Sequence, residues 1–313
     1  MLKFPIRVAS IDVGSNALRF LAVEYKNRSH FNVLKQDRYQ LRLGHDVFLL
    51  GRMKEKTIDS AVQGIKIFKN YLKEFSINNY KAVATSAVRE SQNGEELINR
   101  ARKEVGIILE KISGYGELQF IYISVKNRFR LRNEKWVLAD IGGGSVDVSL
   151  IDKKKILWSE SLKIGAIRLL PELHAATEDP EYLRRHIEKQ IQSLHIPARA
   201  DNKKPAGFIA TGGNIETIAR LLNPSDGISR VSLKDLRELT KKLENLSYRD
   251  RIQEFDLEDD RADVILPAAC VYERLAILSG AEEVIIPHAE LREGIVLYLI
   301  DKLWHRKKMC ARA

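Results

Sequence analysis

The chain has 313 residues, 44% hydrophobic and 30% charged, a composition typical of a globular protein with one large or two ordinary domains. Its 52 lysines and arginines exceed its 42 aspartates and glutamates, which gives a net charge of +10, and residues 1–124 hold most of this excess, with 20 basic against 13 acidic residues. No apolar run approaches the ~18 residues of a membrane span, the first residues do not resemble a signal peptide, and two cysteines cannot build a disulfide framework, so we expect a cytoplasmic protein rather than a secreted, disordered or membrane-embedded one.

In the first part of the chain, hydrophobic spacing predicts strands that alternate with helices. Residues 7–25 are expected to form a strand, a tight turn and a second strand. Residues 57–75 keep the spacing of an amphipathic helix, with Thr57 as its expected N-cap. After a short strand at 81–84, residues 93–105 are predicted to form a helix that ends at Gly106.

The second part repeats this alternation after a basic segment at residues 126–135, which interrupts the apolar periodicity and is interpreted as a connector. Residues 136–151 predict two strands joined by a glycine-rich turn, and residues 208–222 predict a strand, a glycine turn and a helix. Two further helices are expected at 262–278 and 291–303.

One unit occurs twice: a strand that ends in aspartate, a glycine turn and a second strand. The first copy contains Asp12 and the second contains Asp140. The repeat predicts an α/β fold with two related domains and a cleft between them. We place one domain at residues 1–124 plus 292–313 and the other at residues 125–291.

The first copy of the turn, at residues 12–16, has the chemistry of a phosphate site. Asp12 suits the cation that accompanies a phosphate, and the backbone of Gly14, Ser15 and Asn16 can form an anion-binding nest. A capped hairpin turn without a ligand is the alternative interpretation.

The second copy is more specific, because it contains three consecutive glycines between two acids. Glycine loses more conformational freedom on folding than any other residue, and an ordinary hairpin needs only one or two. We therefore expect a phosphate to lie against the backbone of Gly142, Gly143, Gly144 and Ser145. The flanking acids, Asp140 and Asp147, are expected to hold Mg²⁺, which prefers oxygen ligands.

A third glycine turn, Gly212-Gly213, precedes a predicted helix. A helix N-terminus offers free N–H groups to an anion, so this turn is a candidate phosphate site. Such turns are also common without a ligand, and the segment is neither a dinucleotide-binding fingerprint nor a Walker A motif.

Taken in order, these segments resemble the exopolyphosphatase/guanosine-pentaphosphate phosphatase family, in the superfamily of sugar kinases, Hsp70 chaperones and actin. The resemblance extends over nearly the whole chain. Its landmarks are the glycine turns together with residues 84–90 (Ala-Thr-Ser-Ala-Val-Arg-Glu), 112–114 (Ile-Ser-Gly), 261–265 (Arg-Ala-Asp-Val-Ile) and 291–294 (Leu-Arg-Glu-Gly).

The resemblance implies two actin-like (ribonuclease H-like) domains and Mg²⁺-dependent removal of a terminal phosphate from polyphosphate or guanosine pentaphosphate. The family's water-activating glutamate matches Glu117, and the guanidinium fork of Arg89 suits a phosphate oxygen. An ion pair between Arg89 and a nearby acid such as Glu90 is the alternative. The chain also resembles the short members, which lack the C-terminal helical region.

Four positions depart from the family pattern. The family has two adjacent acids where this chain has Gly116 and Glu117, and glutamate where it has Asp147. Ala17 replaces the usual serine, and Asn214 a frequent threonine. These departures bear on substrate choice and rate, while the implied reaction class is retained.

The expected partner is a polyanionic phosphate substrate, and a homodimer would extend a basic track for a long one. The basic excess fits such a partner, although solubility alone also accounts for it. No nucleic-acid-binding signature stands out. Two other functions stay open: a nucleotide or polyphosphate sensor without turnover, and an ATP-dependent kinase of the same superfamily.

Overall fold

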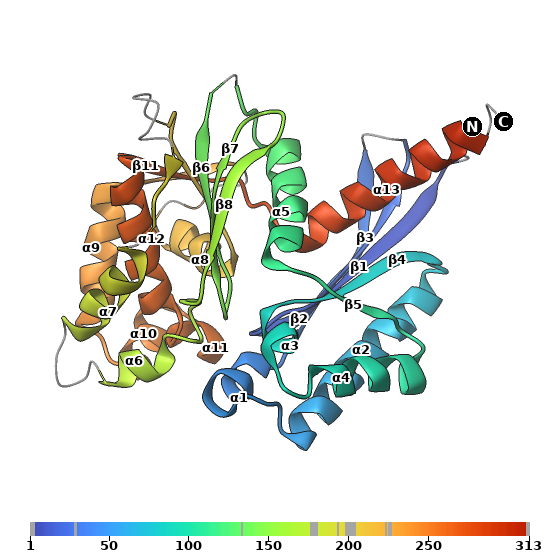
Figure 1. Cartoon of the computed structure of the whole chain (residues 1–313), viewed down its shortest axis with the longest axis horizontal. Helices are drawn as coiled ribbons and strands as arrows, with labels where there is room; N and C mark the ends of the chain where they lie inside the picture. Colours follow the sequence, from blue (N-terminus) through green and yellow to red (C-terminus); the bar gives the residue numbers. More distant parts are fainter. Residues whose placement is uncertain are drawn as a thin grey trace. The chain divides into compact units, whose positions relative to one another are not determined.

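The computed structural model describes residues 4–27, 30–132, 134–175, 181–192, 194–197, 205–222, 224 and 227–310. The chain forms two compact units. Figure 1 labels their helices and strands and colours them by position in the sequence. Unit 1 comprises Met1–Ser124 and Glu290–Ala313, and unit 2 comprises Val125–Ala289. The chain therefore passes between the units after Ser124 and again after Ala289, whereas the sequence pattern places the second passage after residue 291.

Unit 1 contains a five-stranded sheet, in the described residues, with the strand order β3-β2-β1-β4-β5. Strands β1, β2 and β3 are antiparallel neighbours, and β4 and β5 continue the sheet in parallel with β1. The five strands are β1 (Ile6–Val13), β2 (Ala17–Tyr25), β3 (Phe31–Gln40), β4 (Asn79–Ala84) and β5 (Leu109–Lys111). The predicted strand–turn–strand over residues 7–25 is confirmed as β1 and β2.

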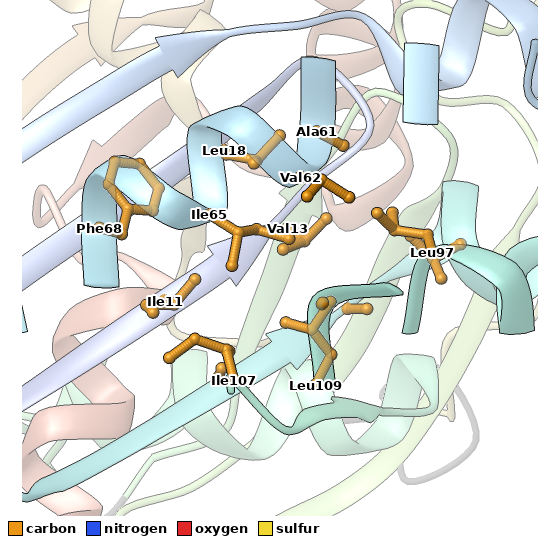
Figure 2. Close-up of a cluster of buried hydrophobic side chains, with 14 of the residues drawn as sticks. Ile11, Val13, Leu18, Ala61, Val62, Ile65, Phe68, Leu97, Ile107 and Leu109 are labelled. Carbon is orange, nitrogen blue, oxygen red and sulfur yellow. The ribbon is translucent and has the colours of Figure 1, made fainter. Parts of the chain in front are cut away.

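One face of this sheet packs against α2 (Glu55–Glu74), the amphipathic helix expected from the sequence. Figure 2 shows Ile65 of α2 beside Val13 of β1, and Phe68 and Ile11 belong to the same buried cluster. Each side chain of this size that leaves water contributes about 1.5–3 kcal/mol to folding. The helix begins two residues before the predicted start, and Lys54 is its N-cap.

Three shorter helices complete this side of unit 1: α1 (Leu43–Leu50), α3 (Ser86–Glu90) and α4 (Gly94–Arg100). A single π-helical turn, Ala101–Val105, follows α4 and ends at Gly106, whose φ of 71° is the left-handed conformation that glycine adopts readily. The predicted helix over 93–105 is therefore correct in extent but not in regularity.

The opposite face of the unit 1 sheet is covered by α13 (Leu291–Cys310) together with α5 (Gly114–Arg128). Val296 and Ile300 of α13 pack on the apolar side chains of β1 and β2. Glu117 lies in the first turn of α5. Helix α5 also continues to Arg128, into the segment interpreted as a connector.

Unit 2 repeats the same strand arrangement in a six-stranded sheet with the order β10-β11-β9-β6-β7-β8 in its described part. Strands β6, β7 and β8 are antiparallel neighbours, while β9 and β11 run parallel to β6. The strands are β6 (Trp136–Ile141), β7 (Val146–Ile151), β8 (Ile156–Leu162), β9 (Phe208–Thr211), β10 (Ser229–Ser232) and β11 (Glu283–Ile286).

Helices α12 and α8 pack on the unit 2 sheet and contact each other. The helices are α6 (Leu170–Ala175), α7 (Tyr182–Ile191), α8 (Gly213–Leu222), α9 (Leu233–Glu244), α10 (Tyr248–Phe255), α11 (Asp259–Ala262) and α12 (Ile265–Ser279). The helix predicted at 262–278 is wrong at its start, because a break at Asp263-Val264 separates α11 from α12.

Both units thus begin with three antiparallel strands and continue with strands parallel to the first, to which unit 2 adds the antiparallel edge strand β10. This is the ribonuclease H-like topology of the actin superfamily. The predicted fold class is confirmed. Within the described residues, every helix is too short or too polar to cross a membrane.

Candidate active site

The three glycines between β6 and β7 form a turn whose carbonyl groups are all engaged by the segment after β8. The carbonyl oxygens of Gly142 and Gly143 accept hydrogen bonds from the backbone amides of residues 166–168 at 2.9 to 3.1 Å. Arg168 Nε donates to the carbonyl oxygen of Gly144 at 2.8 Å. These bonds fix the backbone of the turn without using a side chain of its own.

The amide groups of this turn face the other way. The C=O and N–H groups of a trans peptide point in opposite directions, so the N–H groups of Gly143 and Gly144 point away from residues 166–168. Within the described part of the chain, these two N–H groups donate no hydrogen bond. Adjacent N–H groups of this kind form a concave anion site, and the turn can therefore bind phosphate oxygens through its backbone.

Gly165 packs against the backbone of the triglycine turn, and the sequence alone did not indicate this residue. A Cβ atom at this position would lie 2.4 Å from the backbone N and C of Gly144, closer than any real contact allows. The two backbone segments can approach each other only because residue 165 is glycine. Nothing local marks this residue, since its contact partner lies about twenty positions earlier in the sequence.

Two carboxylates flank the turn on neighbouring strands. Asp140 of β6 and Asp147 of β7 are directly paired across the antiparallel ladder, which puts their side chains on the same face of the sheet. Thr211, paired with Asp140 on the other side, donates from Oγ1 to Asp140 Oδ1 at 2.6 Å. Asp147 is buried, with 6% of its surface exposed, and Ser145 Oγ donates to its Oδ2 at 3.5 Å.

This pair fits the way proteins hold Mg²⁺. The ion takes oxygen ligands, usually from one or two carboxylates, and completes its shell with water and substrate phosphates. Two negative charges at directly paired positions of neighbouring strands repel each other, and a cation between them removes this repulsion. Among the described residues, no group of three or more histidine, cysteine, aspartate or glutamate side chains forms a metal cage. A cation at Asp140 and Asp147 would therefore take its remaining ligands from water and phosphate.

The third glycine turn joins β9 to α8. Gly212 has a φ of 111°, and a Cβ atom there would lie 2.6 Å from the carbonyl oxygen of Ile141 and 3.1 Å from the hydroxyl of Tyr272. A Cβ atom on Gly213 would lie 2.7 Å from the guanidinium of Arg261. The N-terminus of α8 and the positively charged guanidinium of Arg261 therefore lie close together, and this arrangement favours binding of an anion.

In unit 1, Asp12 lies near the end of β1 opposite Arg19 of β2. Arg19 Nη1 donates to Asp12 Oδ2 at 3.2 Å, whereas the buried Oδ1 has no hydrogen-bond partner in the described structure. Burial raises the pKa of Asp12 above its ordinary value, and the charge of Arg19 opposes that rise. A buried carboxylate oxygen that no donor satisfies is a suitable ligand atom for a cation or for metal-bound water.

The turn after β1 is held more tightly by the protein than the triglycine turn. The Gly14 amide donates to the carbonyl oxygen of Ala17 at 3.2 Å, so its N–H is already engaged. The hydroxyls of Ser15 and Ser86 are hydrogen-bonded at 2.8 Å, which joins the turn to the start of α3. Asn16 is largely buried beside them. This turn anchors α3, and through it Arg89.

The two residues expected to act on the reacting groups are brought together in unit 1. Arg89 Nη1 donates to Glu117 Oε1 at 2.6 Å and to the carbonyl oxygen of Ile112 at 2.7 Å. The ion-pair partner of Arg89 is therefore Glu117 rather than Glu90. The Glu117 side chain keeps 12% of its surface exposed, and its place in the first turn of α5 suits a negative charge.

Comparison with known proteins gives this set of residues a family. The family model for the Ppx/GppA phosphatase family matches residues 22–303. Exopolyphosphatase 1 of Mycobacterium leprae is 27% identical over 306 residues, which cover 95% of this chain and 90% of that protein.

Solved structures are similar over the same extent. An exopolyphosphatase from Cytophaga hutchinsonii has a TM-score of 0.87 and 26% identity, and covers 95% of this chain and 98% of its own. The Aquifex aeolicus member of the Ppx/GppA family has a TM-score of 0.76 and 25% identity, with the same coverage of both chains. The family model spans most of the chain, and the protein therefore belongs to the Ppx/GppA phosphatase family.

Proposed function

We propose that this protein is a Mg²⁺-dependent phosphohydrolase that removes the terminal phosphate from inorganic polyphosphate or guanosine pentaphosphate by attack of water. The observation that carries the proposal is the triglycine turn: its carbonyl groups are engaged, while the N–H groups of Gly143 and Gly144 have no partner in the described protein. The paired carboxylates beside it add a cation site. Phosphoryl transfer asks mainly for positioning and for neutralisation of charge, and this arrangement offers both.

In this proposal the backbone of residues 142–145 binds the terminal phosphate. Asp140 and Asp147 hold Mg²⁺, directly or through water, and Asp12 is a further candidate ligand. When bound, the ion neutralises charge on the phosphate oxygens and helps to orient them. The turn at Gly212-Gly213, with Arg261 beside it, offers a second place for an anionic group.

Glu117 is proposed to accept a proton from the attacking water. Arg89 uses Nη1 for Glu117 and Ile112, and its remaining N–H groups have no partner among the described residues. The same guanidinium can therefore bind a phosphate oxygen and hold the carboxylate that activates water. The role as a phosphate ligand and the ion pair are compatible.

The test is a phosphate-release assay on polyphosphate, guanosine pentaphosphate and ATP, each with Mg²⁺ and with a chelator, and without any acceptor. Release from polyphosphate or guanosine pentaphosphate that stops on chelation supports the proposal and shows which substrate is preferred. No release in the absence of an acceptor, followed by phosphate transfer from ATP once an acceptor is added, indicates the kinase. Tight Mg²⁺-dependent binding with no release from any substrate indicates the sensor.

The basic excess of residues 1–124 provides a second test of the substrate. A long polyanion releases many counterions when it binds basic residues, so its affinity falls steeply with salt. We expect the KM for long polyphosphate to rise more with salt than the KM for a short chain. Equal salt dependence for both would exclude an extended basic track.

A further inference from the structure

A buried carboxylate lies outside the groups described above, in the first turn of α13. Glu293 has 4% of its surface exposed, and its Oε2 accepts a hydrogen bond from Ser124 Oγ of α5 at 2.7 Å. The same hydroxyl accepts the amide hydrogen of Glu290 at 3.2 Å. Ser124 is fully buried and acts as donor and acceptor at once, so it joins α5 to the beginning of α13.

The helix backbones also touch at this place. A Cβ atom at Gly294 would lie 1.9 Å from the carbonyl oxygen of Phe120, so α13 can approach α5 only because residue 294 is glycine. Ile295, the next residue, packs in one cluster with Phe120. The segment Glu290–Gly294 is therefore locked on α5 by a hydrogen-bonded carboxylate and by direct backbone contact.

Helix geometry connects this contact to Glu117. Residues seven positions apart lie on nearly the same face of an α-helix, because 3.6 residues make one turn. Glu117 and Ser124 have this spacing, and Phe120 lies between them on the same side. One face of α5 therefore carries Glu117 together with Phe120 and Ser124, the two residues that contact α13. Glu117 and Ser124 lie about 10 Å apart along the helix axis, because each residue adds 1.5 Å.

We propose that Glu293, acting through Ser124, is a positioning residue for Glu117: it fixes how α5 lies on unit 1 and so sets the direction in which the Glu117 carboxylate reaches water. The proposal rests on the function proposed for Glu117. The place of the contact supports it, because Ser124 is the last residue of unit 1 before the chain leaves it and Glu290 is the first after it returns. A bond between these two points holds α5 in unit 1 independently of the chain beyond them.

The test compares disruptive and conservative variants in steady-state kinetics. Ser124→Ala removes the hydroxyl, and Glu293→Met removes the acceptor at similar length, whereas Glu293→Gln keeps an acceptor oxygen. Misplacing a reacting group by about 1 Å costs up to ~10²-fold in rate. We therefore expect kcat to fall tenfold or more in both disruptive variants at unchanged KM, and Glu293→Gln to keep most of the rate. Ser10→Ala, another buried serine of unit 1, is the matched control and should keep its kcat.

A double-mutant cycle separates positioning from a general structural effect. If Ser124 acts through Glu117, Ser124→Ala should cause no further loss in a Glu117→Gln background. An additive loss in that background, or a KM that rises while kcat is retained, would overturn the proposal. If Ser124→Ala does not fold, the same cycle is measured with Glu293→Met, and an additive loss with Glu117→Gln there would overturn the proposal.

Hydrogen exchange provides a readout that does not depend on turnover. Ser124→Ala should speed exchange of the amides at residues 117–120 more than exchange of the amides elsewhere in unit 1, and unchanged exchange there would contradict the proposed coupling. If the wild-type protein released phosphate from no substrate, the proposed function would fail, and this measurement would still show whether Ser124 holds the first turn of α5.

Discussion

Arg89 Nη1 lies 2.6 Å from Glu117 Oε1, so the arginine expected to bind phosphate and the glutamate expected to activate water form one ion pair. They come from different helices, α3 and α5, and are 28 residues apart in the sequence. A carboxylate held by one arginine nitrogen keeps a defined direction, and the rest of the guanidinium fork stays available for another anion. The pair is thus suited to link substrate binding to the position of the base.

Replacing Glu117 by glutamine should lower kcat strongly while the fold and substrate binding persist. The amide can still accept a hydrogen bond from Arg89 but is a poor proton acceptor, and loss of a positioned base typically costs ~10²–10⁴ in rate. Phosphate release under saturating substrate measures the effect. Glu110→Gln, at an exposed glutamate paired with Lys81, is the control and should keep its turnover. A Glu117→Gln variant as fast as the wild type removes Glu117 from the role of base.

Gly165→Ala should damage the phosphate turn, although residue 165 has no chemistry of its own. The new Cβ would be 2.4 Å from the backbone of Gly144, so either segment must shift and the bonds from residues 166–168 must weaken. Overpacking of this kind costs about 1–3 kcal/mol of stability, and we expect KM to rise as well. Gly227→Ala is the control, since no atom of the described residues lies within 4 Å of a Cβ placed there. Normal stability and KM in Gly165→Ala would show that the turn tolerates the displacement.

The parts of the fold that were predicted from the sequence are those with strong local signals. The strands flanking the two aspartate–glycine turns and the apolar face of α2 follow from residue spacing alone. Strand β3 and the break between α11 and α12 were not predicted. Strand β3 alternates weakly because most of its side chains are only partly buried. At the break, the carbonyl oxygen of Ala262 accepts a hydrogen bond from Arg251 Nη1 at 3.4 Å, a contact eleven residues away in the sequence.

The candidate site shows the same division. The glycine turns and their acids are contiguous motifs and were found from the sequence. Gly165, Arg168 and Ser124 were not, because each acts through a partner more than twenty residues away in the chain. A small residue that allows two backbones to touch leaves no pattern in the sequence around it. Long-range contacts of this kind become visible only in the folded chain.

Asp12→Asn should stabilise the protein at neutral pH. Burial raises the pKa of Asp12 in the folded state, so the folded chain holds this proton to a higher pH than the unfolded chain. Stability therefore falls as the pH rises from the ordinary carboxyl value through the raised one, and removing the titration removes that loss. The melting temperature of the variant should exceed that of the wild type at pH 7, with a smaller difference near pH 4. A lower melting temperature at pH 7 would show that the ion pair with Arg19 outweighs burial.

Gly116→Glu would give this chain the two adjacent acids that the family resemblance implies, and the structure accommodates a Cβ atom at this position. A Cβ atom there would lie 3.5 Å from Ile112 and 3.6 Å from Ser113 Oγ, both ordinary contacts. Removing a helical glycine adds about 0.5–1 kcal/mol of stability. We expect turnover to rise relative to Gly116→Gln, which makes the same backbone change without the charge. Equal turnover in the two variants would show that the missing acid does not limit the rate.

The opposed carboxylates of Asp140 and Asp147 predict that Mg²⁺ stabilises unit 2. Without the ion, like charges directly across a strand pair repel each other, so Asp147→Asn should raise the melting temperature in a chelator. With Mg²⁺ and inorganic phosphate, the wild type should have the higher melting temperature. A ligand at a hundred times its Kd adds about 2.7 kcal/mol to the free energy of unfolding of a protein that binds it, and nothing to that of a variant that does not. Glu238→Gln, an exposed acid of the same unit, should behave as the wild type in both conditions. If Asp147→Asn and the wild type gain equally from Mg²⁺, the ion binds elsewhere, and the strand pair is only a like-charge contact that the surrounding hydrogen bonds offset.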